Sequence, residues 1–179
     1  MLSDQRQAPR RCLRVLWWAL ALLAIGASAQ PVPEHDLKAA FVFNFAVFTE
    51  WPSEVLAAGA PMTVCASAAN PLMGALGQLN DKLVNGHRIA LRSAAAGVRG
   101  CHVLVLDRSD RERWAQLKRE LAGSHVLTVS DDADISADGA VIGLSVEDKR
   151  VGFAVHLGAA RSARLNLSSK LLRLARSVQ

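Results

Sequence analysis

Cys101-His-Val-Leu-Val-Leu106 is a continuous apolar run near the middle of the chain, with a single histidine in it. A run of this kind is typical of a strand that is covered on both faces, as in a parallel sheet between two helical layers. A charged, amphipathic helical pattern follows from Asp110 to Leu121 and ends before Gly123. A buried strand followed by an amphipathic helix predicts an α/β fold.

Similar strand patterns recur on both sides of this run, at 62–66, 87–91, 125–129, 140–146 and 151–157. A helix is expected from Asn70 to Leu79, with Pro71 in its first turn. Glu147-Asp-Lys-Arg150 joins the last two strands and predicts an antiparallel hairpin. We therefore predict a single-domain α/β sandwich, in which helices flank a mixed, partly parallel sheet that has its antiparallel hairpin near the C-terminus.

A helix is also expected before the first strand, from Glu34 to Trp51. Leu37, Phe41, Phe45 and Phe48 recur there at helical spacing, and Pro52 cannot continue a helix. Because this helix is apolar on most sides, we expect one side to pack on the sheet and the other to contact a partner or a second copy. Packing of the aromatic residues in the core alone is the alternative. The candidate interface residues are Phe41, Phe43, Asn44, Phe45, Phe48 and Trp51.

The last segment, from Leu165 to Val178, is predicted to be one helix because leucines recur along it at helical spacing. Lys170, Arg173 and Arg176 would then share a broad face away from the leucines. Together with Arg161 and Arg164 they are candidate contacts for an anion or an acidic partner. An ordinary solvated helix surface is the alternative.

The N-terminus resembles an export signal. Arg10, Arg11 and Arg14 precede the apolar run Val15–Ile25, and Ala27-Ser28-Ala29 fits a cleavage site. The apolar run is shorter than the roughly 20 residues that a spanning helix needs. We predict a cleaved signal peptide at 1–29, a short leader at 30–33, an α/β domain at 34–179 and a periplasmic protein. A retained N-terminal anchor is the alternative.

Removal of residues 1–29 changes the charge of the protein. That segment holds four of the 21 Lys and Arg residues and one of the 16 Asp and Glu residues, so the net charge falls from +5 to +2. A nucleic-acid-binding domain usually carries a strongly basic patch. We therefore expect no nucleic acid among the partners.

Two cysteines remain after the predicted cleavage, Cys65 and Cys101, because Cys12 lies in the signal. In an oxidising compartment an even pair is expected to form a disulfide. Two free buried thiols are the alternative.

No pattern in the sequence points to catalysis. The five histidines are far apart, and no G-x-S-x-G, S-x-x-K, C-x-x-C or phosphate-binding glycine loop is present. Asp134-Ile-Ser-Ala-Asp-Gly139 begins like a calcium loop, but position 12 would be Ser145 where a glutamate is needed. We therefore interpret this stretch as a turn between strands. No enzyme activity, metal or cofactor is predicted.

Two long motifs carry a resemblance to a known family. The first motif is Lys38-Ala-Ala-Phe-Val-Phe-Asn-Phe-Ala-Val-Phe-Thr-Glu-Trp-Pro52. It is similar to the pattern K-A-A-F-x-x-N-F-x-x-F-x-x-W-P of the YfiR family of exported bacterial regulatory proteins. The second motif begins with Val151-Gly-Phe-Ala-Val-His-Leu-Gly-Ala-Ala-Arg161, which resembles the family's V-x-F-x-I-N-L-x-A-A. It continues with the segment 165–175, which resembles the family's L-x-I-S-S-K-L-L-x-L-A. Cys65 and Cys101 fall where the family places a cysteine pair.

The resemblance implies a periplasmic α/β protein, often a homodimer, that is not an enzyme. The best-known members of the family repress a membrane-bound diguanylate cyclase by binding its periplasmic sensor region, and an outer-membrane lipoprotein relieves this repression. Cyclic-di-GMP output, biofilm formation and motility respond. Some members carry a second cysteine pair around the segment that corresponds to 131–144, and this chain has none there.

Two other functions remain open. A periplasmic module that binds a small anion, around Arg161, Arg164 and Arg173, could feed a sensor kinase, since the family domain also occurs fused to such kinases. An uncharacterised enzyme is the third possibility, although the scattered histidines give it little support.

Overall fold

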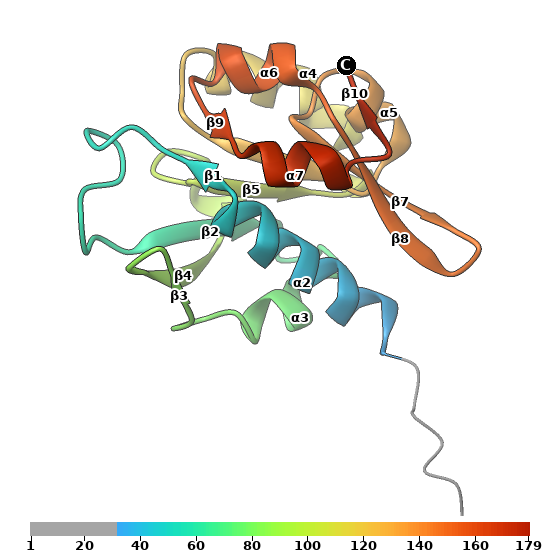
Figure 1. The fold of residues 1–179 in the computed structure, drawn as a ribbon, viewed down its shortest axis with the longest axis horizontal. Helices are drawn as coiled ribbons and strands as arrows, with labels where there is room; N and C mark the ends of the chain where they lie inside the picture. The colour runs from blue at the N-terminus through green and yellow to red at the C-terminus, as the bar shows by residue number, and fades with distance from the viewer. Residues whose placement is uncertain (1–31) are drawn as a thin grey trace, which may run out of the picture. The chain divides into compact units, whose positions relative to one another are not determined.

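The computed structural model describes residues 32–179, and their centre is an eight-stranded mixed sheet (Figure 1). The neighbouring strands in the middle of this sheet, from His87–Ser93 to Ile142–Glu147, run parallel to one another. From one edge to the other the order is β10 (Ser177–Val178), β8 (Arg150–Val155), β7 (Ile142–Glu147), β6 (Leu127–Ser130), β5 (Val103–Leu106), β2 (Met62–Ala66), β4 (His87–Ser93) and β3 (Leu83–Val84). The predicted α/β class and mixed sheet are confirmed.

The run that predicted the fold lies at the centre of this sheet. β5 pairs with β2 on one side and β6 on the other, and all four of its residues are fully buried. Successive side chains along a strand point to opposite faces. Val103 and Val105 accordingly belong to one hydrophobic cluster, and Leu104 and Leu106 belong to another. The sheet therefore has two separate cores, one on each face.

Four helices cover the first face, and Figure 1 shows α2, α3 and α7 on the same side of the sheet. They are α2 (Glu34–Val47), α3 (Met73–Gly77), α6 (Leu157–Ser162) and α7 (Ser169–Leu174). Val42, Phe45 and Ala46 of α2, Leu76 of α3 and Leu171 of α7 are buried in this layer.

The helices α4 (Arg111–Leu121) and α5 (Ala133–Ala137) cover the second face. Trp114, Leu117 and Ile135 fill its core. The turn expected over 134–139 is wrong, because α5 forms there. Asp132 caps that helix by accepting hydrogen bonds from the backbone N–H groups of Asp134 and Ile135. Two short 3₁₀ helices, Ala94–Ala96 and Arg108–Asp110, complete the connections.

The first helix is shorter than expected, since α2 ends at Val47 rather than Trp51. The Thr49 hydroxyl donates to the Phe45 carbonyl oxygen at the end of the helix. Thr49 and Glu50 then form β1, which pairs antiparallel with β9 (Asn166–Leu167) in a separate two-stranded sheet. This pairing leads the backbone out of the helix before Pro52.

The single helix expected from Leu165 to Val178 is wrong. The segment forms β9, then α7, then β10, because neighbouring strands bind both of its ends. The Ser168 side chain caps α7 by accepting a hydrogen bond from the Lys170 N–H. After Leu174 the chain is extended, and the Arg176 N–H donates to the Phe153 carbonyl of β8.

The other expected elements need smaller corrections. The helix expected at 70–79 is reduced to α3 with turns around it, and the strand expected at 151–157 ends at Val155. α6 follows that strand and was not anticipated. The predicted hairpin is confirmed, with β7 and β8 antiparallel and joined by Asp148 and Lys149. Both linking residues have positive φ, as a two-residue hairpin turn of the primed type requires.

The predicted signal peptide lies outside the described residues. Within residues 32–179, no helix combines the length and the apolar character that crossing a membrane requires.

Candidate functional site

The inner side of α2 is a tightly packed part of the first core. Phe45 is fully buried, and its ring centroid lies 4.9 Å from that of Phe153 on β8 in an edge-on arrangement. Phe41 completes the aromatic group, 5.9 Å from Phe45 and 6.0 Å from Phe153. Burial of these rings fixes the rotation of α2 about its own axis, because only one side can face the sheet.

A partly buried ion pair connects the start of α2 to the sheet. The Lys38 ammonium lies 3.1 Å from the Asp131 carboxylate after β6 and 2.7 Å from Glu34 one turn earlier. Burial alone would lower the pKa of Lys38, but the hydrogen bonds and charges of the two carboxylates outweigh it and raise that pKa. The hydrogen bond from Lys38 lowers the pKa of Glu34. The lysine stays charged and connects the helix to the centre of the sheet.

The segment after α2 is held by hydrogen bonds to distant backbone groups. The Trp51 indole N–H donates to the His125 carbonyl oxygen at 2.9 Å. The Asn85 side-chain amide, in the β3–β4 turn, donates to the Val47 carbonyl oxygen at 3.0 Å. The polar group of Trp51 is therefore used within the chain.

The outer side of α2 has a different character. Ala40 and Asn44, one turn apart, are exposed, and the Asn44 side-chain N–H donates to the Ala40 carbonyl oxygen at 2.9 Å. Partly exposed apolar side chains flank them on this side: Leu37, Phe41, Phe43, Val47 and Phe48. We call Leu37, Ala40, Phe43, Asn44 and Val47 the outer stripe of α2. Ala40 and Asn44 are its exposed members, whereas Leu37, Phe43 and Val47 are only partly exposed, and Phe43 and Val47 also pack against the first core.

The residues predicted to form an interface therefore divide into groups. Asn44 and Phe43 lie on the outer stripe, and Phe41 and Phe48 lie at its borders. Phe45 lies entirely in the core and presents no surface, whereas Trp51 is partly exposed although its indole N–H donates to the His125 carbonyl oxygen. Sequence reasoning missed Ala40 and Lys38. Ala40 lies one helical turn before Asn44, and Lys38 lies one turn after Glu34. This spacing was the signal that the sequence offered.

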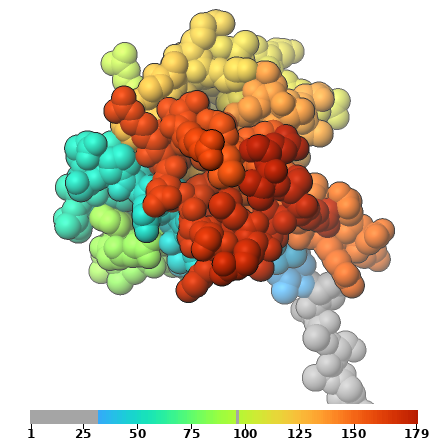
Figure 2. Space-filling model, turned by 45° about the horizontal axis from the view of Figure 1, so that its top comes forward, coloured from blue at the N-terminus to red at the C-terminus, as the bar shows by residue number. Residues whose placement is uncertain are grey.

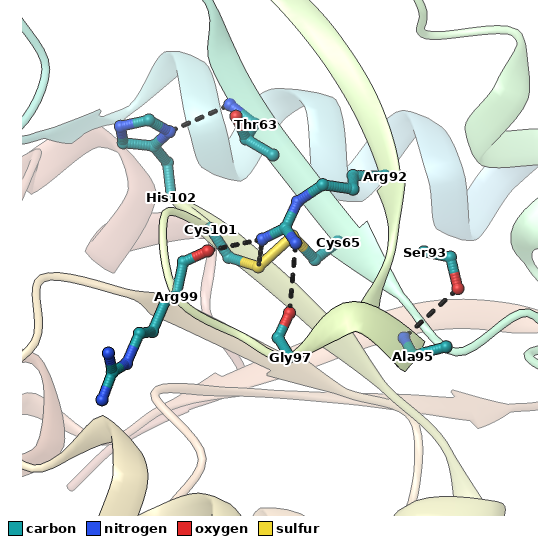
Figure 3. Close-up of a disulfide and its surroundings, with 9 residues drawn as sticks. All are labelled: Thr63, Cys65, Arg92, Ser93, Ala95, Gly97, Arg99, Cys101 and His102. Carbon is teal, nitrogen blue, oxygen red and sulfur yellow. Dashed lines mark hydrogen bonds between the residues drawn. A yellow bond between two sulfur atoms is a disulfide. The ribbon is translucent and has the colours of Figure 1, made fainter.

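The two cysteines form a disulfide between β2 and the start of β5, on the second face of the sheet (Figure 3). Cys65 is fully buried and Cys101 nearly so. The Arg92 guanidinium from β4 donates to the Gly97 and Arg99 carbonyl oxygens and lies 3.1 Å from the Cys101 sulfur. The predicted bridge is thus a buried connection between two neighbouring central strands.

His102, next to the disulfide, supports the backbone. Its Nδ1 accepts a hydrogen bond from the Thr63 N–H at 2.9 Å, as Figure 3 shows, and its Nε2 lies 3.4 Å from the Val55 carbonyl oxygen. Nδ1 must be unprotonated to accept this bond. Burial lowers the pKa of His102, against the hydrogen bond to Val55, and the nearby His87 also lowers it.

Of the predicted basic contacts, Arg161, Arg164, Lys170 and Arg173 are exposed and form no ion pair within residues 32–179. Arg176 differs, because it lies 2.6 Å from the Glu147 carboxylate and 3.4 Å from the Ser145 hydroxyl on β7. Its side chain crosses β8 at Gly152, where an added Cβ would overlap it. Arg176 therefore connects the C-terminal segment to the hairpin.

Several cavities indent the surface around α4. One of about 790 Å³ is lined by Cys101, His102, His125 and Glu120 among others. One of about 300 Å³ lies between α4 and α6 and is lined by Trp114, Lys118 and Thr128. In the part of the chain that the structure describes, no group of three or more His, Cys, Asp or Glu side chains could hold a metal ion.

The family model described as YfiR/HmsC-like matches residues 35–176, from the first turn of α2 to Arg176. The chain belongs to this family. The outer stripe, the disulfide and the basic residues of α6 and α7 all lie within the matched range.

The fold is also similar to that of a solved structure, a conserved domain protein from Vibrio cholerae O1 biovar El Tor strain N16961, with a TM-score of 0.53 at 9% sequence identity. The alignment covers 83% of this chain and 61% of the Vibrio chain, so the likeness concerns the fold alone. Among curated proteins, none matches the sequence.

Proposed function

We propose that this protein is a periplasmic regulator without catalytic activity that binds the periplasmic sensor region of a membrane-bound diguanylate cyclase and represses it. Membership of the YfiR/HmsC-like family supports a periplasmic regulatory role in cyclic-di-GMP signalling. The choice of partner and the direction of its effect are the proposal. Biofilm formation and motility would follow the change in cyclic-di-GMP.

The outer stripe of α2 carries this proposal. Ala40 and Asn44 do not contribute to the core, because both are exposed and the opposite side of α2 packs on the sheet. An exposed apolar helix side is how an amphipathic helix recognises a groove or a partner helix. The small Ala40 lets a partner backbone approach, and the Asn44 amide can form hydrogen bonds with it.

The mechanism follows from the rigidity of this helix. The aromatic group and the Lys38–Asp131 pair hold α2 in one orientation, so little conformational freedom is lost on binding. A ligand shifts an equilibrium only by its difference in affinity for the two states. Repression therefore requires that the outer stripe fit the inactive sensor region better than the active one, and an outer-membrane lipoprotein that covers the stripe would relieve it.

A pair of matched substitutions tests the proposal. Deletion of the gene should raise cyclic-di-GMP, and wild-type protein supplied from a plasmid should lower it again. Ala40→Glu places a charge in the outer stripe and should fail to lower it. Ala115→Glu makes the same change at an exposed position on α4 and should act as wild type.

Measurements on the purified proteins distinguish a loss of partner binding from a loss of folding. Both variants should unfold at the same urea concentration as wild type, because both positions are exposed helix surface. Their masses by light scattering will show whether the outer stripe also forms the predicted homodimer. Unchanged cyclic-di-GMP in the deletion strain, or full activity of Ala40→Glu, would refute the proposed role.

A further inference from the structure

Charge is unevenly distributed along the described chain. Residues 150–179 contain six basic side chains and no Asp or Glu, whereas residues 32–149 contain 11 basic and 15 acidic side chains. The net charge is therefore +6 for the C-terminal part and −4 for the part before it. The six basic residues are Arg150, Arg161, Arg164, Lys170, Arg173 and Arg176.

Four of these residues lie on the neighbouring segments α6 and α7 or in the chain between them. α6 and α7 lie side by side and are joined through β9, and Figure 2 shows these segments together on the face toward the viewer. Arg161 lies on α6, Arg164 follows it, and Lys170 and Arg173 lie on α7. All four are exposed without an ion pair among the described residues. We call them the basic surface.

An exposed leucine lies within this surface. Leu174 is 68% exposed, although its neighbour Leu171 on α7 is buried in the core. Arg173 precedes it directly and Lys170 lies one turn before it. An apolar side chain that projects between cations is typical of helices that lie on an anionic membrane, where the leucine enters the headgroup region and the cations bind phosphate.

We propose that the basic surface and Leu174 dock the protein on a bilayer that contains anionic phospholipid. The cations are spread over α6, the residues that follow it and α7, and none of them lines either of the cavities described above. That arrangement suits a broad layer of phosphate groups better than a single small anion. The inference does not depend on the cyclase as partner, although docking would concentrate the protein beside any membrane receptor.

Vesicle binding tests the inference. Protein purified from the periplasm of an expressing strain should sediment with vesicles that contain phosphatidylglycerol and stay in solution with vesicles of phosphatidylcholine alone. Each basic residue near an anionic surface contributes about 1 kcal/mol. The variant R161Q/R164Q/K170Q/R173Q should therefore lose roughly a thousandfold in binding, and raised salt should weaken the wild type. Leu174→Ser should weaken binding several-fold without changing the net charge.

A matched variant controls for overall charge. R99Q/R108Q/R119Q/K149Q removes four exposed cations that lie outside the basic surface, and it should bind nearly as well as wild type. Equal loss in the two quadruple variants would refute a specific surface, as would the absence of binding to phosphatidylglycerol. Binding to polyglutamate but not to vesicles would also overturn the inference and would indicate an acidic protein partner.

Discussion

The two helical layers of this sheet differ in what they present to solvent. On the second face, α4 buries Trp114 and Leu117 and turns Glu112, Gln116 and other polar residues outward. On the first face, α2 buries Phe45 equally well but turns Ala40, Asn44 and partly exposed aromatic residues outward. The polar outer side of α4 is well solvated and needs no partner to cover it. The outer side of α2 leaves Ala40 and Asn44 exposed beside partly exposed aromatic residues, and this is the surface that the proposed function assigns to a partner.

The largest expected effect compares the two sides of α2. Phe45→Ala should lower the free energy of unfolding by about 3–5 kcal/mol, because it empties a fully buried site between Phe41 and Phe153. Asn44→Ala should change it by less than about 0.5 kcal/mol and yet reduce repression of the cyclase. Urea unfolding and cyclic-di-GMP assays measure the two effects. A loss of stability in Asn44→Ala as large as in Phe45→Ala would remove the distinction between the sides.

Removal of the disulfide tests whether the second layer is needed for binding through the first. Replacement of both Cys65 and Cys101 by alanine opens a loop of sequence separation 36 and should cost about 3–4 kcal/mol of stability. At temperatures where the variant remains folded, binding through the outer stripe of α2 should be retained, because the bridge lies on the opposite face. Urea unfolding with and without reductant gives the stability change. Loss of partner binding in the folded variant would show that the layers are coupled.

The ion pair between α2 and the sheet should have an intermediate effect. Lys38→Ala leaves the half-buried Asp131 without its partner and should cost about 1–3 kcal/mol. Asp131→Asn in the same background should recover part of that loss, since the uncompensated charge is removed. Equal stability of the single and double variants in a urea titration would indicate that the pair is not what fixes the start of α2.

The smallest expected effect is a pH dependence. The pKa of His102 in the folded protein lies below its ordinary value of 6.5, so the unfolded chain binds a proton more readily. Stability from this group is complete above pH 6.5 and should decrease as the pH falls from 6.5 toward the lowered folded pKa. The difference in the free energy of unfolding between wild type and His102→Gln, measured by urea unfolding from pH 7.5 to 5, separates the contribution of His102 from that of His87. A difference that is constant across that range would contradict the role of Nδ1 as an acceptor.

Much of the fold could be predicted from local patterns, and the failures have a common cause. The run 101–106 and the hairpin at 147–150 identified the sheet, because continuous apolar runs and short linkers report burial and turn geometry directly. Thr49, Asn166 and Ser177 lie in two-residue strands whose existence depends on partners far along the chain. Leucine spacing cannot reveal such pairing, so the last helix was predicted too long.

The candidate site was predictable in its location but not in its details. The spacing of phenylalanines placed a helix with two apolar sides, yet only the packing against Phe153 decides that Phe45 points inward and Asn44 outward. The ion pair of Lys38 joins residues 93 positions apart, which no local pattern indicates.

The positions of the two tryptophans among the described residues have a consequence for spectroscopy. Trp51 packs against the first core and Trp114 lies in the second, so each layer contains its own fluorophore. In protein without residues 1–29, which hold the other two tryptophans, Trp51→Phe and Trp114→Phe would each leave one tryptophan and let the emission of each layer be followed separately during denaturation. Coincident transitions would show that both layers melt as one cooperative unit, whereas an earlier change at Trp51 would show that the layer containing α2 loosens first.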